Sequence, residues 1–140
     1  MDDFISKDNK IAIIGVSQKS GKYGSKMYIS LKEFGYKVFG VNPKYDELWG
    51  NKIYHVVADI PEQVDVAVMV VPPKVTEKVI EEIKAAGIKK VWMQPGSESD
   101  KAIKYCEDND IECIHHACFV VDGLKDDFVT FEHESGEVKG

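Results

Sequence analysis

The stretch Ile11-Ala12-Ile13-Ile14-Gly15-Val16-Ser17-Gln18-Lys19-Ser20-Gly21-Lys22-Tyr23-Gly24 joins an apolar run to a glycine-rich turn and then to an amphipathic pattern. This order predicts a strand from about Lys10 to Gly15, a tight loop, and the N-terminus of a helix. The first N–H groups of a helix have no intrahelical partner, and the aligned peptide dipoles add partial positive charge there. The stretch therefore predicts an anion-binding loop that suits a phosphate or pyrophosphate.

The rest of the chain alternates β-branched runs with helical patterns, which is typical of parallel βαβ units. The other predicted strands are Lys37 to Val41, Val66 to Val71, Lys90 to Met93 and Ile111 to Ile114, with a short strand near Ile53 and a single turn near Asp59. The run from Val66 is continuously apolar, so we expect it in the middle of the sheet. We predict an α/β fold, a single-domain Rossmann-like doubly wound parallel sheet of about five strands with helices on both faces.

Three apolar stripes at helical spacing predict the helices that cover this sheet. Their members are Met27, Leu31 and Phe34 in the first, Val75, Val79, Ile83 and Ala86 in the second, and Ala102, Ile103 and Cys106 in the third. Gly35 and Gly87 suit the left-handed position after a helix end. Ser97 or Ser99 is expected to cap the third helix.

Composition indicates one ordinary domain, with a core over about residues 4–122 and a partly mobile extension over residues 123–140. Of the 140 residues, 44% are hydrophobic and 30% are charged, and no apolar run is long enough to span a bilayer. The start of the chain is acidic and does not resemble a secretory signal, so we expect a cytoplasmic protein without a membrane partner. Three cysteines, an odd number, fit reduced thiols in that compartment.

The net charge of −6 argues against general nucleic-acid binding, which needs a basic surface. The anion-binding loop instead indicates a phosphate-bearing small molecule as the partner. In a doubly wound sheet ligands bind at the carboxyl ends of the strands, where the strand order reverses. We expect three loops to meet there, namely Val16 to Gly24, Asn42 to Lys44, and Pro72-Pro73, with Gln94 to Gly96 at the rim.

Two common phosphate motifs do not fit the glycine-rich stretch. A Walker A loop has four residues between its first glycine and the Gly-Lys pair, followed by Ser or Thr, whereas here five separate Gly15 from Gly21 and Tyr23 follows Lys22. The dinucleotide pattern Gly-x-Gly-x-x-Gly fails because Ser17 stands at its second glycine. An ATPase of the Walker type is therefore disfavoured, and the loop alone does not define the ligand.

The tip of the second strand is more informative. NAD-binding domains usually carry Asp or Glu there for the ribose 2′-hydroxyl, but this chain has Val41-Asn42-Pro43-Lys44. A lysine attracts a phosphate, so the ligand is expected to carry one on its ribose, which leaves NADP or coenzyme A. Pro72-Pro73 offers a flat apolar rim for an adenine face or a pantetheine arm.

Four segments together resemble a known family. The segments Gly15 to Gly24, Val41 to Lys44, Val70-Val71-Pro72-Pro73 and Trp92-Met93-Gln94-Pro95-Gly96 look like those of the stand-alone CoA-binding proteins, which are similar to the N-terminal domain of the succinyl-CoA synthetase α subunit. The likeness covers about residues 4–121. It implies that Val16 to Ser20 approach the phosphates, that Lys44 faces the ribose phosphate or its neighbour, and that Val71 to Pro73 border the adenine or pantetheine.

The motifs together give the predicted coenzyme-binding set. Its members are Gly15, Val16, Ser17, Gln18, Lys19, Ser20, Lys22, Tyr23, Gly24, Asn42, Pro43, Lys44, Val71, Pro72, Pro73, Gln94, Pro95 and Gly96. The resemblance implies coenzyme A or an acyl-CoA as the ligand. In the synthetase the phosphate-carrying histidine lies in a later domain that we do not expect here, so succinyl-CoA synthesis by this chain is not expected.

The cysteines near the predicted last strand raise two further possibilities. Stand-alone family members commonly carry an Asn-Arg-Cys-like segment here, whereas this chain has His116-Ala117-Cys118. Cys118 follows the last strand, so we hypothesise a mixed disulfide with the coenzyme thiol, against the plainer interpretation of a buried cysteine that packs as a small hydrophobe. Cys113, His115, His116 and Cys118 do not predict a metal site, because neighbours on a strand point to opposite faces.

Two classes of function remain open from the sequence. The first is a non-catalytic module that binds or senses CoA, since no catalytic constellation can be placed. The alternative is an NAD(P)-binding redox sensor or small oxidoreductase, which the fold alone supports.

Overall fold

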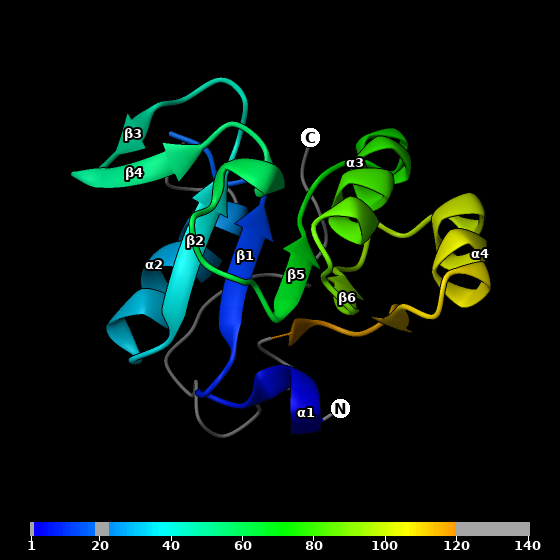
Figure 1. Cartoon of the computed structure of the whole chain (residues 1–140). Helices are drawn as coiled ribbons and strands as arrows, with labels where there is room; N and C mark the ends of the chain where they lie inside the picture. The colour runs from blue at the N-terminus through cyan, green and yellow to red at the C-terminus, as the bar shows by residue number, and fades with distance from the viewer. Residues whose placement is uncertain (1, 19–22, 120–140) are drawn as a thin grey trace.

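The computed structural model describes residues 2–18 and 23–119, which form one mixed sheet with helices on both faces (Figure 1). The elements in chain order are α1 (Asp2–Ile5), β1 (Lys10–Ile14), α2 (Tyr23–Glu33), β2 (Lys37–Val41), β3 (Glu47–Leu48), β4 (Asn51–Tyr54), the 3₁₀ turn η1 (Val57–Asp59), β5 (Val66–Met69), α3 (Pro73–Ala85), β6 (Lys90–Met93), α4 (Asp100–Asp108) and β7 (Glu112–Ile114). The prediction of a doubly wound α/β fold is confirmed.

The seven strands lie in the order β3-β4-β2-β1-β5-β6-β7. All neighbours pair in parallel except β3 and β4, which form an antiparallel hairpin at one edge. The predicted count of about five strands is therefore wrong. The predicted short strand near Ile53 is β4, whereas β3 was not predicted, because its two residues are too few for an apolar period to appear.

Alternate residues of each strand supply two separate cores. On β1, Ile11 and Ile13 pack in a cluster with Met27 and Leu31 of α2, while Ala12 and Ile14 pack in another cluster under η1, α3 and α4. Residues 11–14 of β1 and the residues of β5 have almost no exposed surface because helices cover both faces (Figure 1). The sheet thus separates the molecule into an α2 side and an α3–α4 side.

The apolar stripe predicted for α3 is wrong at its first member. Val75 is 39% exposed, and the residues of α3 that are buried are Thr76, Ile80 and Ile83. A search for apolar residues selects Val75 over the polar Thr76. Thr76 lies four residues before Ile80 and seven before Ile83, however, so it shares their buried face of the helix.

The helix ends are largely as predicted. Gly35 follows α2 with φ +97°, and Gly87 follows α3 with φ +77°. The Ser99 hydroxyl accepts from the Ala102 N–H at 3.0 Å and caps α4. Ser97, the other candidate cap, instead accepts from the Val71 N–H at 3.0 Å.

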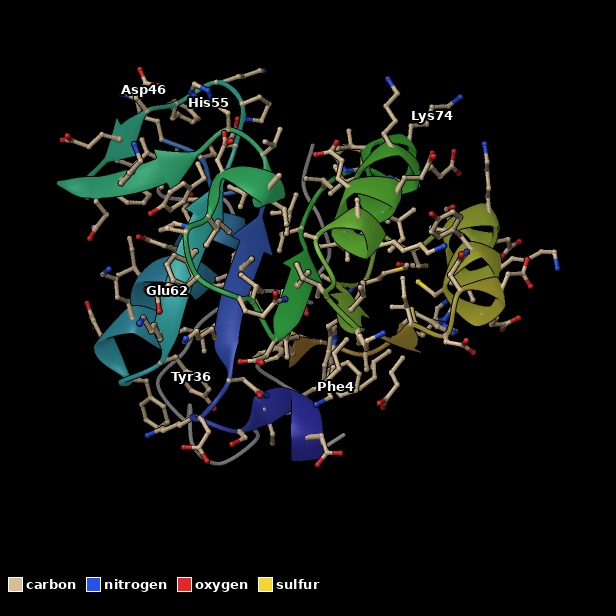
Figure 2. The ribbon with its side chains drawn as sticks, viewed as in Figure 1. Phe4, Tyr36, Asp46, His55, Glu62 and Lys74 are labelled. Atoms are coloured by element: carbon tan, nitrogen blue, oxygen red, sulfur yellow. The ribbon has the colours of Figure 1, made fainter. Side chains whose placement is uncertain are left out.

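An ion-pair cluster marks the amino ends of the central strands (Figure 2). Glu62 pairs with Lys10 of β1 at 3.2 Å and with Lys37 of β2 at 2.5 Å. The hydrogen bonds from these lysines lower the pKa of Glu62. The cluster lies at the edge of the sheet opposite the one predicted to bind a ligand.

Two glycines with positive φ allow a direct test of how closely the end of β1 packs against its neighbours. A Cβ added to Gly15, at φ +118°, would lie 2.2 Å from the Val70 carbonyl oxygen, whereas a Cβ added to Gly35 would meet nothing within 4 Å. We expect Gly15→Ala to lower the free energy of unfolding by more than about 3 kcal/mol, and Gly35→Ala by roughly 1 to 2 kcal/mol. Urea denaturation of both variants measures the difference. Equal losses would show that the end of β1 tolerates a side chain.

Candidate functional site: the carboxyl ends of the parallel strands

The strand order reverses at β1. The chain leaves β1 for β2 and β4 on one side and returns to β5 on the other side. The loops after β1, β2 and β5 consequently begin at neighbouring points of one edge, which confirms the predicted layout for their described residues. In Figure 1 the arrowheads of β1, β2 and β5 point to this edge.

Glycines let the first loop lie directly on its neighbours. The Gly15 N–H donates to the Val41 carbonyl of β2 at 3.0 Å, and the Val70 N–H donates to the Ile14 carbonyl at 2.8 Å. A Cβ on Gly24, in the first turn of α2, would lie 2.6 Å from the Gly15 carbonyl oxygen. The helix therefore starts against the loop backbone, as an anion-binding loop requires.

A buried serine fixes the loop further along. The Ser25 hydroxyl, which is fully buried, donates to the Ser17 carbonyl at 2.5 Å and accepts from the Ser17 N–H at 3.2 Å. The Val16 side chain is also fully buried, and Gln18 is exposed. Lys19, Ser20 and Lys22 lie outside the described residues.

Asn42 connects the first loop to the second. Its Nδ2 donates to the Val16 carbonyl at 2.8 Å, and its Oδ1 accepts from the Lys44 N–H at 2.9 Å. The same side chain thus holds the glycine-rich loop and shapes the turn that carries Pro43 and Lys44, both of which are exposed. Asn42 was predicted as a ligand contact, and the structure gives it a positioning contact on each side.

A His–Asp pair stands beside this turn and was missed from the sequence. His55 follows β4 directly, and its Nε2 lies 2.7 Å from Asp46 Oδ1 (Figure 2). The Asn42 N–H donates to the Tyr54 carbonyl at 2.9 Å, so Asn42 and His55 leave neighbouring strands side by side. Recognising β4 as a partner of β2 would have placed His55 here.

The third loop is apolar and exposed. The Val71 N–H is bound by the Ser97 hydroxyl, and Pro72 and Pro73 follow on the surface. α3 begins at Pro73, and Pro72 gives it no side-chain cap. The loop therefore presents an apolar rim and the positive end of a 13-residue helix.

Gln94, the first residue of the fourth predicted loop, has a structural role. The Gln94 side chain is fully buried; its Oε1 accepts from the Phe119 N–H at 2.6 Å, and its Nε2 lies 3.4 Å from the Cys118 sulfur. Pro95 is half-buried and Gly96 is exposed. Gln94 thus ties residues 118–119 to the end of β6, which leaves Pro95 and Gly96 as the surface of this segment.

Cys118 is buried beside the Gln94 side chain, with 2% of its surface exposed. Its placement agrees with a cysteine that packs as a small hydrophobe. A mixed disulfide between Cys118 and a coenzyme thiol would require this buried sulfur to become exposed, and it stays a prediction. Among residues 2–18 and 23–119, no group of three or more His, Cys, Asp or Glu side chains is arranged to hold a metal ion.

Comparison with known proteins agrees with this geometry. The model of a family described as a CoA binding domain matches residues 9–123. The chain belongs to the CoA-binding domain family. A conserved hypothetical protein from Pyrococcus furiosus has the same fold, with a TM-score of 0.77 and 42% identity over 81% of this chain and 97% of that one.

Other relatives contain this CoA-binding domain within larger enzymes. An ADP-forming acetate–CoA ligase of Methanocaldococcus jannaschii is 44% identical over 86 residues, which cover 61% of this chain and 12% of the ligase. The apo dinucleotide-forming acetyl-coenzyme A synthetase 1 of Ca. Korarchaeum cryptofilum matches with a TM-score of 0.66 and 30% identity, covering 75% of this chain and 25% of that one. The chain therefore spans only a minor part of these enzymes.

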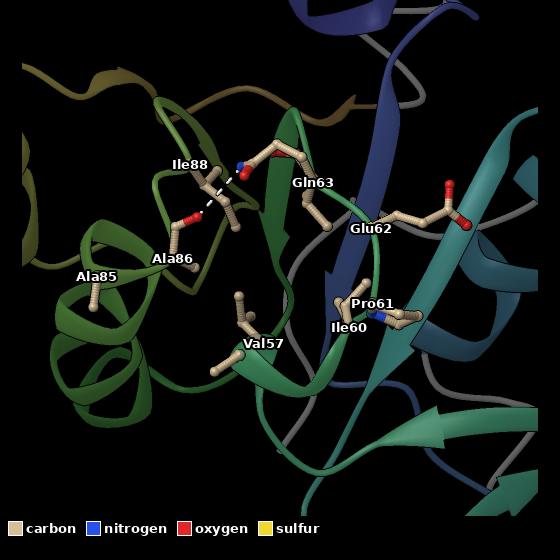
Figure 3. Close-up of a pocket in the computed structure, with 10 residues that line it drawn as sticks. Val57, Ile60, Pro61, Glu62, Gln63, Ala85, Ala86 and Ile88 are labelled. Carbon is tan, nitrogen blue, oxygen red and sulfur yellow. Dashed lines mark hydrogen bonds between the residues drawn. The ribbon is translucent and has the colours of Figure 1, made fainter.

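A cavity of about 370 Å³ lies elsewhere on this CoA-binding domain (Figure 3). It opens between η1 and the end of α3, where Gln63 Nε2 donates to the Ala86 carbonyl at 3.3 Å. Its lining includes Val64 and Ile88, which precede β5 and β6. The cavity thus lies nearer to the amino ends of the strands than the predicted coenzyme loops do.

No helix in the described part of the chain is long and apolar enough to cross a membrane.

The two hydrogen bonds of Asn42 can be separated by substitution. Asn42→Ala removes both, and Asn42→Asp keeps the acceptor for the Lys44 N–H but places a carboxylate against the Val16 carbonyl. We expect each variant to lose about 1 to 3 kcal/mol of unfolding free energy, because both leave the Val16 carbonyl without its donor. Chemical denaturation checks this. An Asn42→Asp variant as stable as the parent would exclude the bond to Val16 as a support of the loop.

Proposed function

We propose that this CoA-binding domain binds coenzyme A or an acyl-CoA at the carboxyl ends of β1, β2 and β5 and performs no chemistry on it. Lys44 is the observation that carries the proposal. It stands exposed at the tip of β2, where an NAD site usually has an acid, and Asn42 fixes the turn that presents it. The ammonium group attracts the ribose phosphate that distinguishes CoA from NAD.

The remaining loops suit the other parts of the same ligand. In this proposal the glycine-rich loop between β1 and α2 holds the pyrophosphate. Pro72 and Pro73 supply an apolar surface for the adenine or the pantetheine arm. Lys19, Ser20 and Lys22 complete the phosphate loop in this proposal.

Besides the exposed His55–Asp46 pair, three buried or half-buried polar side chains lie at this edge. Ser25, Asn42 and Ser97 each bond to the backbone of a loop at this edge. These side chains hold the loops in place, and a general base or nucleophile would need to face the ligand instead. We therefore assign the domain the role of holding or sensing the coenzyme, or of presenting it to another protein, in the cytoplasm.

Ligand identity can be tested by thermal shift. We expect CoA at about 100 times its dissociation constant to raise the melting temperature by roughly 5 to 10 °C, dephospho-CoA at the same concentration to raise it less, and NAD to have almost no effect. The order follows from the phosphate that Lys44 recognises. A shift with NAD or NADP and none with CoA would reject the proposal in favour of an NAD(P)-binding redox sensor or small oxidoreductase.

Lys44 itself can be tested by a selective loss of affinity. We expect Lys44→Ala to weaken CoA about tenfold or more and dephospho-CoA less than about twofold, measured by isothermal titration calorimetry. Lys89→Ala is the matched control, because Lys89 is also exposed but precedes β6 at the opposite edge. Equal weakening of both ligands would remove Lys44 from contact with the ribose phosphate.

A further inference from the structure

The turn that follows β2 is fastened to β4 at both of its ends. At its start the Asn42 N–H donates to the Tyr54 carbonyl at 2.9 Å. At its end the Asp46 carbonyl accepts from the Ile53 N–H at 3.0 Å. Lys44 occupies the middle of this turn, so its position relative to the end of β4 is set by the backbone.

A side-chain pair joins the same two segments (Figure 2). His55 is the residue directly after β4, and its Nε2 lies 2.7 Å from Oδ1 of Asp46, which is two residues after Lys44. The His55 side chain is 51% exposed. The imidazole therefore stands in solvent at the edge where β2 and β4 end, within reach of a ligand held by the turn.

The contact with Asp46 decides which nitrogen of His55 carries a proton. A carboxylate can only accept hydrogen bonds, so Nε2 is the donor in this pair. In a neutral imidazole the other nitrogen, Nδ1, then has no proton and can only accept. In the described part of the chain Nδ1 has no hydrogen-bond partner. Neutral His55 thus presents a lone pair to its surroundings, whereas protonated His55 presents an N–H and a positive charge.

A phosphate group distinguishes these two forms of His55. Its oxygens are negatively charged acceptors, so they repel a lone pair on Nδ1 and bind an Nδ1–H of an imidazolium. Imidazole is also the side chain that changes its charge between about pH 5 and pH 8. A phosphate bound beside His55 would therefore bind more tightly as the pH falls through this range, and its binding would take up a proton.

The charges around the pair determine what this proton adds. The charged side chains on the neighbouring elements are Lys44 and Asp46 of the turn, Glu47 and Lys52 of the β3–β4 hairpin, and Asp59 of η1. Glu47 and Lys52 are opposite in charge and are direct partners in the hairpin register. Within the turn Lys44 and Asp46 also balance each other. Protonation of His55 therefore leaves the turn with an excess positive charge, which attracts a phosphate.

We propose that protonated His55 is a second recognition residue for the ribose phosphate of coenzyme A, and that Asp46 orients its imidazole. The inference rests on the proposed coenzyme site and deepens it. A lysine ammonium is charged throughout the range in which an imidazole titrates, so Lys44 attracts the phosphate at each pH and His55 adds to it at the lower end. The preference for CoA over dephospho-CoA, which lacks this phosphate, rises as the pH falls.

Calorimetric titration of the full chain at two pH values tests the proposal. We expect the ratio of the CoA affinity to the dephospho-CoA affinity to rise about fourfold from about pH 8 to about pH 6.5, on the basis of a phosphate contact that is worth about tenfold. In His55→Gln the ratio should change by less than about twofold, because the amide can still donate to Asp46 but gains no proton. Any protonation of the ligand phosphate itself is common to both proteins.

His116→Gln is the matched control. His116 is also an exposed histidine near a carboxylate, with its Nε2 3.8 Å from Glu98 Oε1, but it follows β7 at the other end of the strand order. Its ratio should rise as in the parent. A parent ratio that is the same at both pH values, or a rise that His55→Gln retains, would overturn this inference and leave CoA binding intact. Absence of CoA binding at both pH values would overturn the proposed function together with this inference.

Nuclear magnetic resonance of the imidazole C–H groups follows His55 directly, with His55→Gln identifying its signal. We expect saturating CoA to raise the pH midpoint of that signal by about one pH unit, which is the tenfold contact expressed as a proton affinity, and dephospho-CoA to leave it nearly unchanged. The signal of His116 should not respond to either ligand. A His55 midpoint that CoA does not move would contradict the contact with the phosphate.

Discussion

The end of β1 can lie between the ends of β2 and β5 only because residue 15 has no side chain. A Cβ there would meet the Val70 carbonyl oxygen at 2.2 Å, and a Cβ on Gly24 would meet the Gly15 carbonyl at 2.6 Å. These two contacts bring a loop, a neighbouring strand end and a helix start together at the level of the backbone. The backbone of the glycine-rich loop therefore packs directly against β2, β5 and the start of α2.

The central strands could be predicted because burial on both faces makes their sequences continuously apolar. β1, β5 and β6 have this property, and each lies between two other strands. The short strand near Ile53 was predicted, but β3 and its antiparallel pairing with β4 were not. The hairpin is held by the pairing of β4 with β2 and by Leu48, which packs in the α2-side cluster, and neither contact is visible in so short a segment.

The loops of the site were predictable, but the bonds that hold them were not. Glycines, prolines and strand ends are local signals, so the positions of Gly15, Lys44 and Pro72 followed from the sequence. The contacts of Asn42 with Val16 and of Ser97 with Val71 join residues 26 positions apart. Such pairs depend on the strand order, which a single sequence does not specify. Gln94 shows the consequence, since its motif suggested a ligand contact and its buried amide holds Phe119.

Because the chain as a whole is negatively charged, the charges close to Lys44 matter more for attracting an anionic ligand than the overall composition does. The chain carries a net charge of −6, so an anionic ligand meets a generally unfavourable potential. Asp46, two residues after Lys44, adds to this effect; its carboxylate lies 2.7 Å from His55 Nε2, and its charge is offset only when that imidazole is protonated. The hydrogen bond from the Lys44 N–H to Asn42 holds the turn, while the lysine side chain remains exposed to solvent. Because solvent-exposed charges more than about 10 Å apart are largely screened, a lysine at the site can still attract a phosphate to an acidic protein. The selectivity that we propose therefore comes from the position of one ammonium group on a turn held by an amide.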